Sequence, residues 1–451
     1  MRLLLPIPTM NATPNIIEPS EHPIKTDMID DEALHVMRKL NRAGFSSYLV
    51  GGGVRDLYLG KTPKDFDIGT DARPGQIRRL FNNSRTIGRR FRLVQVFFKN
   101  RKTIEVSTLR SLSEHDIDGP EAVLAPNNTY GTPDEDALRR DLTINALFYE
   151  IQNRTIIDYV GGVNDLDRGI IRIIGAADRR ITNDPVRMMR AVRHSVRNHF
   201  MVEEESWAAI CRNHHLLRLC PPSRLRDETL NDIYSSVAAE WFELSLDGNL
   251  FTELFPIYQE QLATKMHDGA SCRDHLARIF LTIDRVNRQA VASGNHRQPD
   301  YFFLAFLLIP WAEISFNLVE LKLKGPQLYQ LAKHIRETVN QTIGLDFNLR
   351  RSTRQEITTL LAHLPLLHLN QNENSWPKWL KRKSYFKKCR LLYLFYREAI
   401  EGVEAEDYNY PVDESSEKLK RQRSKRSKKS RRQGRPAFSG SKRGGVFGFK
   451  R

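Results

Sequence analysis

The spacing of apolar and polar positions predicts that strands alternate with helices over about the first 150 residues. After Asp30 and Asp31, apolar residues recur at helical spacing until Gly44, which is a helix stop signal. Runs of apolar residues, some alternating with polar ones, indicate strands at Ser47–Val50, Asp65–Ile68, Leu93–Phe98 and Thr103–Leu109. Short helical segments follow the first strand and Pro74, so we expect this part of the chain to be an α/β unit.

From about Asp184 onward the pattern becomes helical and almost without strands. Apolar residues recur at helical spacing from Val186 to Val196, and we expect Asp184 to cap this helix with Pro185 in its first turn. The apolar segments Tyr301–Ile309 and Leu391–Tyr396 are typical of buried helices. These patterns divide the chain into a flexible N-terminal arm at 1–29, a head at 30–150, a neck at 151–240, a helical body at 241–400 and a tail at 401–451.

The net charge of +16 is concentrated in the tail rather than spread over the chain. From Lys418 to Arg451 there are 15 Lys and Arg and no acidic residue, which leaves 55 basic against 54 acidic residues before it. An acidic stretch at about 401–417 precedes this basic run, which has too few apolar residues to fold, so we expect a disordered tail. Such a tail binds polyanions by neutralising phosphates, and a purely solubilising role is the alternative.

Cysteine usage and hydropathy indicate a reducing, cytoplasmic location. The four cysteines show no disulfide framework, and Cys211, His214, His215 and Cys220 lack the second ligand pair that zinc sites require. No stretch of about 18 apolar residues exists that could span a membrane. The apolar start is interrupted by prolines, so we do not expect a signal peptide.

A glycine turn and a group of carboxylates carry the candidate chemistry. The sequence LVGGGVRD at 49–56 would let backbone N–H groups approach a phosphate closely, although many such turns are only structural. Asp65 and Asp67 are two apart in a predicted strand, so both carboxylates would share one face and suit Mg²⁺. Glu105 alternates with apolar residues and could supply a third carboxylate for two-metal phosphoryl transfer.

Four motifs in order then resemble the class II nucleotidyltransferases, the family of bacterial poly(A) polymerases and CCA-adding enzymes. They are GGGVRD, DFD, RRDLTINAL at 139–147 and DPVRMMRAVR at 184–193, within a resemblance that covers about residues 30–240. The resemblance implies a polymerase-β-like α/β nucleotidyltransferase head followed by a mostly α-helical neck and body, before the disordered basic tail. It also implies that the neck binds the nucleotide base and RNA and that the body binds RNA.

The resemblance assigns roles to particular residues. Two Mg²⁺ ions are held by Asp65 and Asp67, with ATP as the substrate, and either Asp141 or Glu105 is the third catalytic acid. The remaining nucleotide-binding residues are Gly52 and Arg55 for the triphosphate, Arg140, Asp141 and Asn145 for the nucleotide and notably its ribose, and Asp184, Arg187 and Arg190 for the base. We expect Asp141 and Asn145, four apart, to share a face of one helix.

The arginines of the neck motif have a second interpretation. Arg187, Arg190, Arg193 and Arg197 lie along one side of the predicted helix, opposite its apolar stripe, and could be a solvated face instead of a binding surface. In the family the motif usually begins with Glu, whereas this chain has Asn183, which weakens the inference about base selection.

Within the family, TIGRRFRLVQVFF at 86–98 resembles the poly(A) polymerase version of this segment. The predicted function is therefore template-independent addition of AMP from ATP to the 3′ ends of varied single-stranded RNAs, with release of pyrophosphate. This activity would promote RNA decay, with the RNA-decay machinery as a candidate partner. The alternatives are a CCA-adding transfer RNA nucleotidyltransferase and, less favoured because all three carboxylates are present, a catalytically inactive RNA-binding protein.

Deletion of residues 418–451 tests the assignment of the tail to RNA. The deletion removes 15 positive charges and no predicted core, so the shortened protein should fold and keep its chemical step at saturating RNA. Each phosphate contact that is lost should flatten the slope of log affinity against log salt by about 0.7 for single strands. The measurement is RNA affinity across a salt series for both proteins. Identical slopes would assign the tail to solubility instead.

Overall fold

The computed structural model describes residues 13–88, 92–99, 102–111, 130–294, 297–318, 323, 325–369, 376 and 378–405. Internal contacts divide the chain into Met1–Tyr408 and Asn409–Arg451. The second unit lies outside the described residues, as does the predicted basic tail from Lys418. Among the helices that are described, none is long and apolar enough to cross a membrane.

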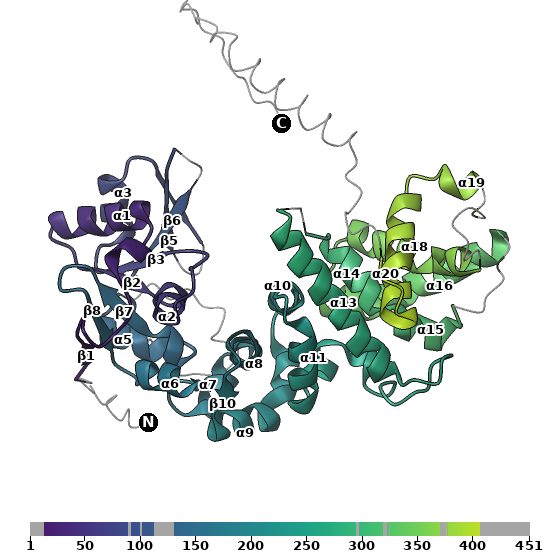
Figure 1. Cartoon of the computed structure of the whole chain (residues 1–451), viewed down its shortest axis with the longest axis horizontal. Coiled ribbons are helices and arrows are strands. Elements are labelled where there is room, and N and C mark those ends of the chain that lie inside the picture. The colour runs from purple at the N-terminus through teal and green to yellow at the C-terminus, as the bar shows by residue number, and fades with distance from the viewer. Residues whose placement is uncertain are drawn as a thin grey trace, which may run out of the picture. The chain divides into compact units, whose positions relative to one another are not determined.

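An eight-stranded mixed sheet organises the N-terminal part of the chain (Figure 1). Its strand order is β1-β8-β7-β2-β3-β6-β5-β4, and a separate two-stranded sheet joins β10 to β9. Within the large sheet β3 and β6 run parallel, and the other neighbouring pairs are antiparallel. The strands are β1 (Asn15–Ile17), β2 (Ser47–Val50), β3 (Asp67–Thr70), β4 (Ser84–Ile87), β5 (Leu93–Phe97), β6 (Thr103–Thr108), β7 (Leu147–Glu150), β8 (Thr155–Asp158), β9 (Ile170–Ile171) and β10 (Met201–Val202).

Short helices accompany the sheet, and helices dominate the chain after it (Figure 1). Those of the sheet region are η1 (Thr26–Met28), α1 (Asp31–Arg42), α2 (Gly52–Tyr58), α3 (Pro74–Leu80), α5 (Pro133–Arg139) and η3 (Thr143–Asn145). The next group is α6 (Gly162–Arg168), α7 (Ala177–Asn183), α8 (Val186–Asn198), α9 (Glu204–Asn213), η4 (His214–Leu219), α10 (Pro222–Ile233), α11 (Ala238–Asp247), α12 (Leu250–Leu254) and η5 (Pro256–Tyr258). The last are α13 (Cys272–Ala292), α14 (Asp300–Leu307), α15 (Ile309–Phe316), α16 (Gly325–Gln341), α17 (Ile343–Asp346), α18 (Arg351–His368), α19 (Lys378–Lys381) and α20 (Phe386–Glu401). The predicted change from an α/β head to a mostly helical body is confirmed.

Local sequence signals account for several of these elements. The Asp30 carboxylate caps α1 by accepting hydrogen bonds from the backbone N–H groups of Glu32 and Ala33. Gly44 follows the helix with a φ of +83°, a conformation that suits glycine. The strands predicted at 47–50, 93–98 and 103–109 and the helix after Pro74 are all present, with ends that differ by one or two residues.

Part of the predicted flexible arm is instead a strand of the sheet. Asn15–Ile17 pairs antiparallel with β8, and Ile17 and Ile24 are buried. The arm prediction, residues 1–29, is therefore wrong for this stretch, while residues 1–12 lie outside the described part. Three residues give too short a pattern to predict a strand, and their partner lies about 140 residues later in the chain.

The two faces of the large sheet carry different side chains. On one face, buried residues such as Leu49, Ile68 and Val106 lie where α1 and α3 contact the sheet. On the other face, Phe148 stands opposite Val50, Val50 opposite Asp67, and Asp67 opposite Glu105 across neighbouring strands. Residues directly opposite each other point to the same face, so this row changes from apolar to acidic as it crosses the sheet.

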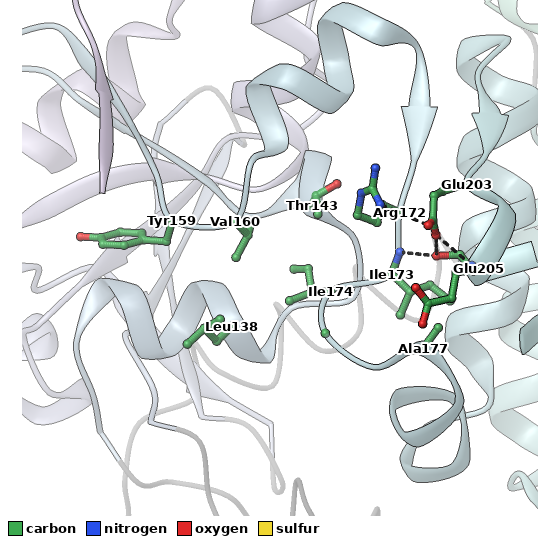
Figure 2. A pocket seen from close by; sticks show the side chains of 12 residues that line it. Leu138, Thr143, Tyr159, Val160, Arg172, Ile173, Ile174, Ala177, Glu203 and Glu205 are labelled. Carbon is green, nitrogen blue, oxygen red and sulfur yellow. Dashed lines mark hydrogen bonds and ion pairs between the residues drawn. The ribbon is translucent and has the colours of Figure 1, made fainter. Parts of the chain in front are cut away.

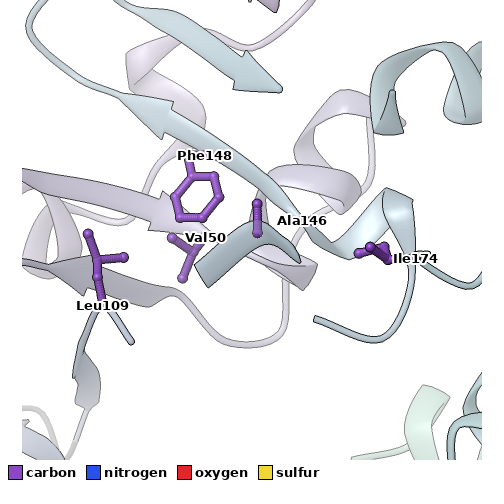
Figure 3. Close-up of a cluster of buried hydrophobic side chains, with 6 residues drawn as sticks. Val50, Leu109, Ala146, Phe148 and Ile174 are labelled. Atoms are coloured by element: carbon purple, nitrogen blue, oxygen red, sulfur yellow. The ribbon is translucent and has the colours of Figure 1, made fainter. Parts of the chain in front are cut away.

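The apolar half of that row belongs to a small core beside α5. Val50, Leu109, Ala146, Phe148 and Ile174 pack together with Ala137 of α5, as Figure 3 shows for the five labelled side chains. Tyr48 and Tyr159 contact Phe148 edge to face from either side. This core fixes the strands that continue into the acidic half of the row.

Two expectations about local structure are wrong. Asp184 is the C-cap of α7 and not the N-cap of α8. The N-cap position of α8 is Pro185, and in the described structure no side chain caps that helix. Asp141 and Asn145 do not share a helix, because α5 ends at Arg139 and Asn145 closes the separate turn η3. Their spacing of four fits a helix, but the chain between them turns back to form a bridge with Ile173.

Truncation of Phe148 tests the core beside the acidic row. Phe148 is fully buried, so Phe148→Ala should lower the free energy of unfolding by about 3–5 kcal/mol through lost burial and a cavity. The matched control is Ile16→Ala in the same sheet, whose side chain is 51% exposed and should cost less than about 0.5 kcal/mol. Chemical denaturation of both variants provides the comparison. Equal losses would show that burial does not determine the difference.

Candidate active site

Three carboxylates lie at the start of β3 and in the middle of β6. Asp67 is the first residue of β3 and stands directly opposite Glu105, because β3 and β6 pair in parallel. Glu105 in turn accepts a hydrogen bond from Gln95 Nε2 on β5, 3.0 Å away. Asp65 precedes β3 in an irregular segment, so the expected strand geometry holds for Asp67 but not for Asp65.

Electrostatics nevertheless places Asp65 with the other two acids. Asp67 is exposed at the start of β3, but the groups packed around it remove part of its hydration. This loss of hydration, followed by the neighbouring charges of Glu105 and Asp65, raises the pKa of Asp67 to about 6. Arg140 acts in the opposite direction and favours the ionised form of Asp67. The site therefore carries excess negative charge that a cation would neutralise.

The glycine turn lies beside these carboxylates. Gly51 has a φ of +69° at the start of α2, and a Cβ there would lie 3.1 Å from Nη1 of Arg140. A Cβ on Gly53 would stand 3.6 Å from the backbone oxygen of Asp65. In the described structure no side chain caps the first turn of α2, so no side chain accepts a hydrogen bond from its first N–H groups.

Arg140 is held in place between the turn and the sheet. Its Nε and Nη2 donate to Oδ2 of Asp136 at 3.1 and 2.9 Å, and Nη1 donates to the backbone oxygen of Asn145. Its guanidinium also lies 5.3 Å from the ring centre of Phe148. This arrangement fixes a positive charge close to the carboxylates.

Asp141, the other candidate for the third acid, has different surroundings. Its Oδ2 accepts a hydrogen bond from Nη1 of Arg190 at 3.1 Å, and Nδ2 of Asn145 lies 3.5 Å from Oδ1. Burial would raise the pKa of Asp141, but Arg190, Arg187 and His194 outweigh it and hold this pKa well below its usual range. Asp141 is therefore a carboxylate paired with the neck helix α8 and not a member of the acidic row.

Arg55 was expected to reach the triphosphate, but its donors are already engaged. Nε and Nη2 donate to Oδ1 of Asp56, and Nη1 donates to Oδ1 of Asn145 at 2.5 Å. Nη1 also lies 3.3 Å from Nδ1 of His194, and the side chain is only 9% exposed. Its geometry suits the positioning of Asn145, and contact with a triphosphate stays a prediction.

His194 connects the head to α8 and was missed by the sequence interpretation. Burial and the charge of Arg55 lower its pKa well below the ordinary value, so the ring is neutral at pH 7. Its Nε2 lies 3.4 Å from Nδ2 of Asn145. The only sequence signal was a histidine one turn after Arg190, which alone is weak evidence.

Three of the four arginines of α8 pair with groups of the protein and do not form a solvated face. Arg193 is buried and donates to Oε2 of Glu228 at 2.6 Å and to Asp232, both on α10. Arg190 bridges Asp141 and Glu228, and Arg187 donates to the backbone oxygens of Arg139 and Arg140. The expectation that these arginines lie opposite the apolar stripe is wrong for Arg193, while Arg197 is exposed.

Asp184, a predicted base contact, is held by Arg224. Nη1 and Nη2 of Arg224 each lie 2.8 Å from one carboxylate oxygen of Asp184, which is the bidentate geometry that arginine favours. Arg224, Glu228 and Asp232 are successive on one face of α10. Sequence reasoning missed all three, because their only signal is this spacing within a helix of mixed composition.

A cavity of ≈260 Å³ lies apart from these residues (Figure 2). Arg172, Glu203 and Glu205 line it, and Arg172 is paired with both Asp165 and Glu203. None of the predicted site residues lines this cavity. It is therefore not part of the candidate active site.

The carboxylates of the acidic row suit Mg²⁺ by their chemistry. They are hard oxygen donors, and two of them are in register. Loss of hydration and then mutual repulsion raise the pKa of Asp67. Within the described part of the chain, however, no group of three such side chains lies close enough together to coordinate a metal ion. A cation and a nucleotide phosphate would have to complete the coordination.

Known proteins resemble this chain in sequence and in fold. Residues 47–172 match the family model "Poly A polymerase head domain", and residues 199–262 match "Probable RNA and SrmB- binding site of polymerase A". The crystal structure of Bacillus stearothermophilus CCA-adding enzyme in complex with CTP aligns with a TM-score of 0.59. It covers 89% of this chain and 83% of that one at 22% identity, which shows a common fold.

Sequence relatives indicate the family to which the chain belongs. Poly(A) polymerase I of Salmonella typhi is 38% identical over 312 residues, which are 68% of this chain and 66% of that protein. The CCA-adding enzyme of Lactobacillus gasseri is 36% identical over 223 residues, 49% of this chain and 54% of that protein. The chain belongs to the class II nucleotidyltransferase family of bacterial poly(A) polymerases and CCA-adding enzymes. The match thus spans just under two thirds of the Salmonella protein.

The pKa of Asp67 predicts a pH-dependent effect on stability. The pKa of Asp67 is higher in the folded than in the unfolded protein, so ionisation of its carboxyl group destabilises the fold. The protein is therefore most stable with respect to this group below about pH 4, and it loses that stability as the pH rises through about 6. Asp67→Asn should therefore raise the melting temperature of the Mg²⁺-free protein by about 1–3 °C at pH 7.5. The gain should shrink to about half at pH 5.

The control for this measurement is Asp71→Asn, an exposed aspartate just beyond the other end of β3. It should leave the melting temperature unchanged at both pH values. A gain for Asp67→Asn that is the same at pH 7.5 and pH 5 would contradict the role of its ionisation.

Proposed function

We propose that this protein transfers AMP from ATP to RNA 3′ ends without a template. The 3′-hydroxyl group loses its proton to solvent, and its oxygen forms a bond to the α-phosphorus. The bond from that phosphorus to the oxygen shared with the β-phosphorus breaks, and pyrophosphate leaves with that oxygen. The observation that carries the proposal is the register of Asp67 with Glu105 beside the glycine turn. The matches to a polymerase head and to an RNA-binding segment support it.

In this proposal Asp65, Asp67 and Glu105 hold two Mg²⁺ ions. When bound, the ions favour ionisation of the attacking hydroxyl and stabilise the charge on the leaving pyrophosphate. The parallel pairing of β3 and β6 keeps two of the carboxylates side by side for this purpose. Glu105 is favoured as the third acid, because it stands opposite Asp67 whereas Asp141 is paired with Arg190.

The nucleotide would lie between the glycine turn and α8. No side chain caps the first turn of α2 in the described structure, so the backbone N–H groups around Gly52 would bind the triphosphate, and Arg140 beside the turn would add positive charge. Asp141 and Asn145 are suited to the ribose, since both offer polar atoms in one small network with Arg55. Arg190 keeps Asp141 ionised and therefore able to accept hydrogen bonds from ribose hydroxyls.

Base recognition is assigned to Asp184 and Arg187 of the neck. The bidentate contact with Arg224 fixes the carboxylate of Asp184, and Arg187 is oriented by backbone oxygens of the head. These contacts would preorganise the hydrogen-bonding edges that replace a template. RNA would be bound by the neck and body and by the basic tail, and the tailed RNA would be directed to the decay machinery.

CCA addition to transfer RNA is the second candidate function. The fold of the Bacillus enzyme supports it, but the sequence match to the Lactobacillus enzyme covers less of this chain than the match to poly(A) polymerase I. Incubation of a transfer RNA lacking its 3′ end with each nucleotide separates the two. Long products with ATP alone support polyadenylation, whereas arrest after three mixed nucleotides supports CCA addition.

Substitution of the acidic row tests the proposed chemistry. Asp67→Asn should reduce AMP incorporation by about a thousandfold or more, because it removes a ligand that contacts the charge-stabilising ions. RNA affinity measured without nucleotide should stay within about twofold, since the reacting site is not needed for it. Asp71→Asn is the matched control and should keep full activity. Near-normal incorporation by Asp67→Asn would overturn the assignment of the site.

A further inference from the structure

The head carries a cluster of basic side chains in addition to the acidic row. A cavity of ≈450 Å³, open to solvent, is lined by Arg73, Pro74, Gly75, Gln76, Arg79, Arg92 and Tyr130. We name it the arginine pocket. Among the described residues, its lining contains three guanidinium groups and no carboxylate.

The arginines of this pocket differ from the arginines around the glycine turn, Arg55 and Arg140, and from Arg172 of the neck. Arg55, Arg140 and Arg172 each pair with a carboxylate. By contrast, the structure gives Arg79 and Arg92 no ion pair with any described carboxylate, and both are exposed. The guanidinium of Arg73 instead lies 5.4 Å from the ring centre of Tyr130.

Uncompensated charges at close range repel each other and gain free energy when an anion joins them. Arg78 and Arg85 extend the same charge along α3 and β4, and they too are exposed without an ion pair among the described residues. The pocket therefore presents a strong positive potential, although the chain before the tail is close to neutral.

The pocket combines this charge with an accessible aromatic ring. Tyr130 is 39% exposed, and the planar guanidinium of Arg73 already lies over it. Arginine for phosphates and an aromatic surface for bases are the pair of features by which proteins bind single-stranded nucleic acid. An acidic polypeptide would use the cations but would gain nothing from the ring.

We propose that the arginine pocket binds the RNA strand through its phosphodiester backbone and one stacked base. The proposal rests on RNA being the substrate, as given under Proposed function. Asp67 is the first residue of β3, and Arg73 lies six residues later, just after the strand ends. Because an extended chain rises by about 3.3 Å per residue, Arg73 lies within about 20 Å of Asp67. The pocket contacts nucleotides upstream of the reacting 3′ end and takes no part in the chemical step.

The test is the full-length variant Arg73→Gln/Arg79→Gln/Arg92→Gln. Its matched control is Arg42→Gln/Arg168→Gln/Arg336→Gln, which removes three exposed arginines that also lack an ion pair among the described residues. RNA affinity is measured without ATP across a salt series, with a 20-nucleotide oligoadenylate as the probe, which is about the scale of a single-strand site. The pocket variant should bind about 10–50-fold more weakly, with a salt slope flatter by about 2, whereas the control should match the parent chain.

Further measurements separate the outcomes. The single variant Arg92→Gln, at an exposed position before β5, repeats the test with a minimal change if the triple variant fails to fold. Tyr130→Leu should weaken RNA binding while binding of inorganic polyphosphate is unchanged, because stacking needs a base. Since ATP is omitted, a failure of adenylation leaves these affinities interpretable.

Three results would overturn the proposal. Equal weakening in the pocket and control variants would show a general charge effect. Unchanged RNA affinity in the pocket variant would show that RNA does not contact it. Loss of binding to polyglutamate with RNA affinity unchanged would assign the pocket to an acidic protein instead.

Discussion

The candidate site depends on one constraint, which is the need to hold like charges side by side. Parallel pairing of β3 with β6 places Asp67 opposite Glu105, and Asp65 adds a third negative charge nearby. The carboxylates cannot move apart without breaking the register of the sheet. Loss of hydration and then this repulsion raise the pKa of Asp67, and a cation bound there would neutralise the excess negative charge.

The rest of the region supports this arrangement. The core around Phe148 and Val50 fixes the strands, and Arg140 brings one compensating charge to the edge of the acidic row. Beyond it, negative and positive side chains alternate from Asp141 through Arg190, Glu228 and Arg193 to Asp232. Buried charges are tolerated only when paired, so this chain of ion pairs couples the position of α8 to that of α10 and to the head.

The two kinds of arginine in the head are consistent with two kinds of task. Arginines with carboxylate partners, such as Arg55 and Arg140, have fixed positions and fix other groups in turn. The arginines of the arginine pocket, which pair with no carboxylate in the described part of the chain, retain their attraction for an external anion. The difference is electrostatic, because the charge of a paired guanidinium is already neutralised by a carboxylate within the protein.

The sequence alone determined the elements that depend on near neighbours. These are four of the eight strands of the large sheet, α1 with its Asp30 cap, the glycine turn, the apolar stripe of α8, and Asp67 with Glu105 as candidate ligands. Tertiary structure decided what depends on distant residues. Asn15–Ile17 became a strand only by pairing with β8, and Arg193 became buried only because Glu228 and Asp232 on α10 receive its charge. Periodicity reports which side of an element is apolar, but it carries no information about a partner many residues away, and burial of a charge is decided by that partner.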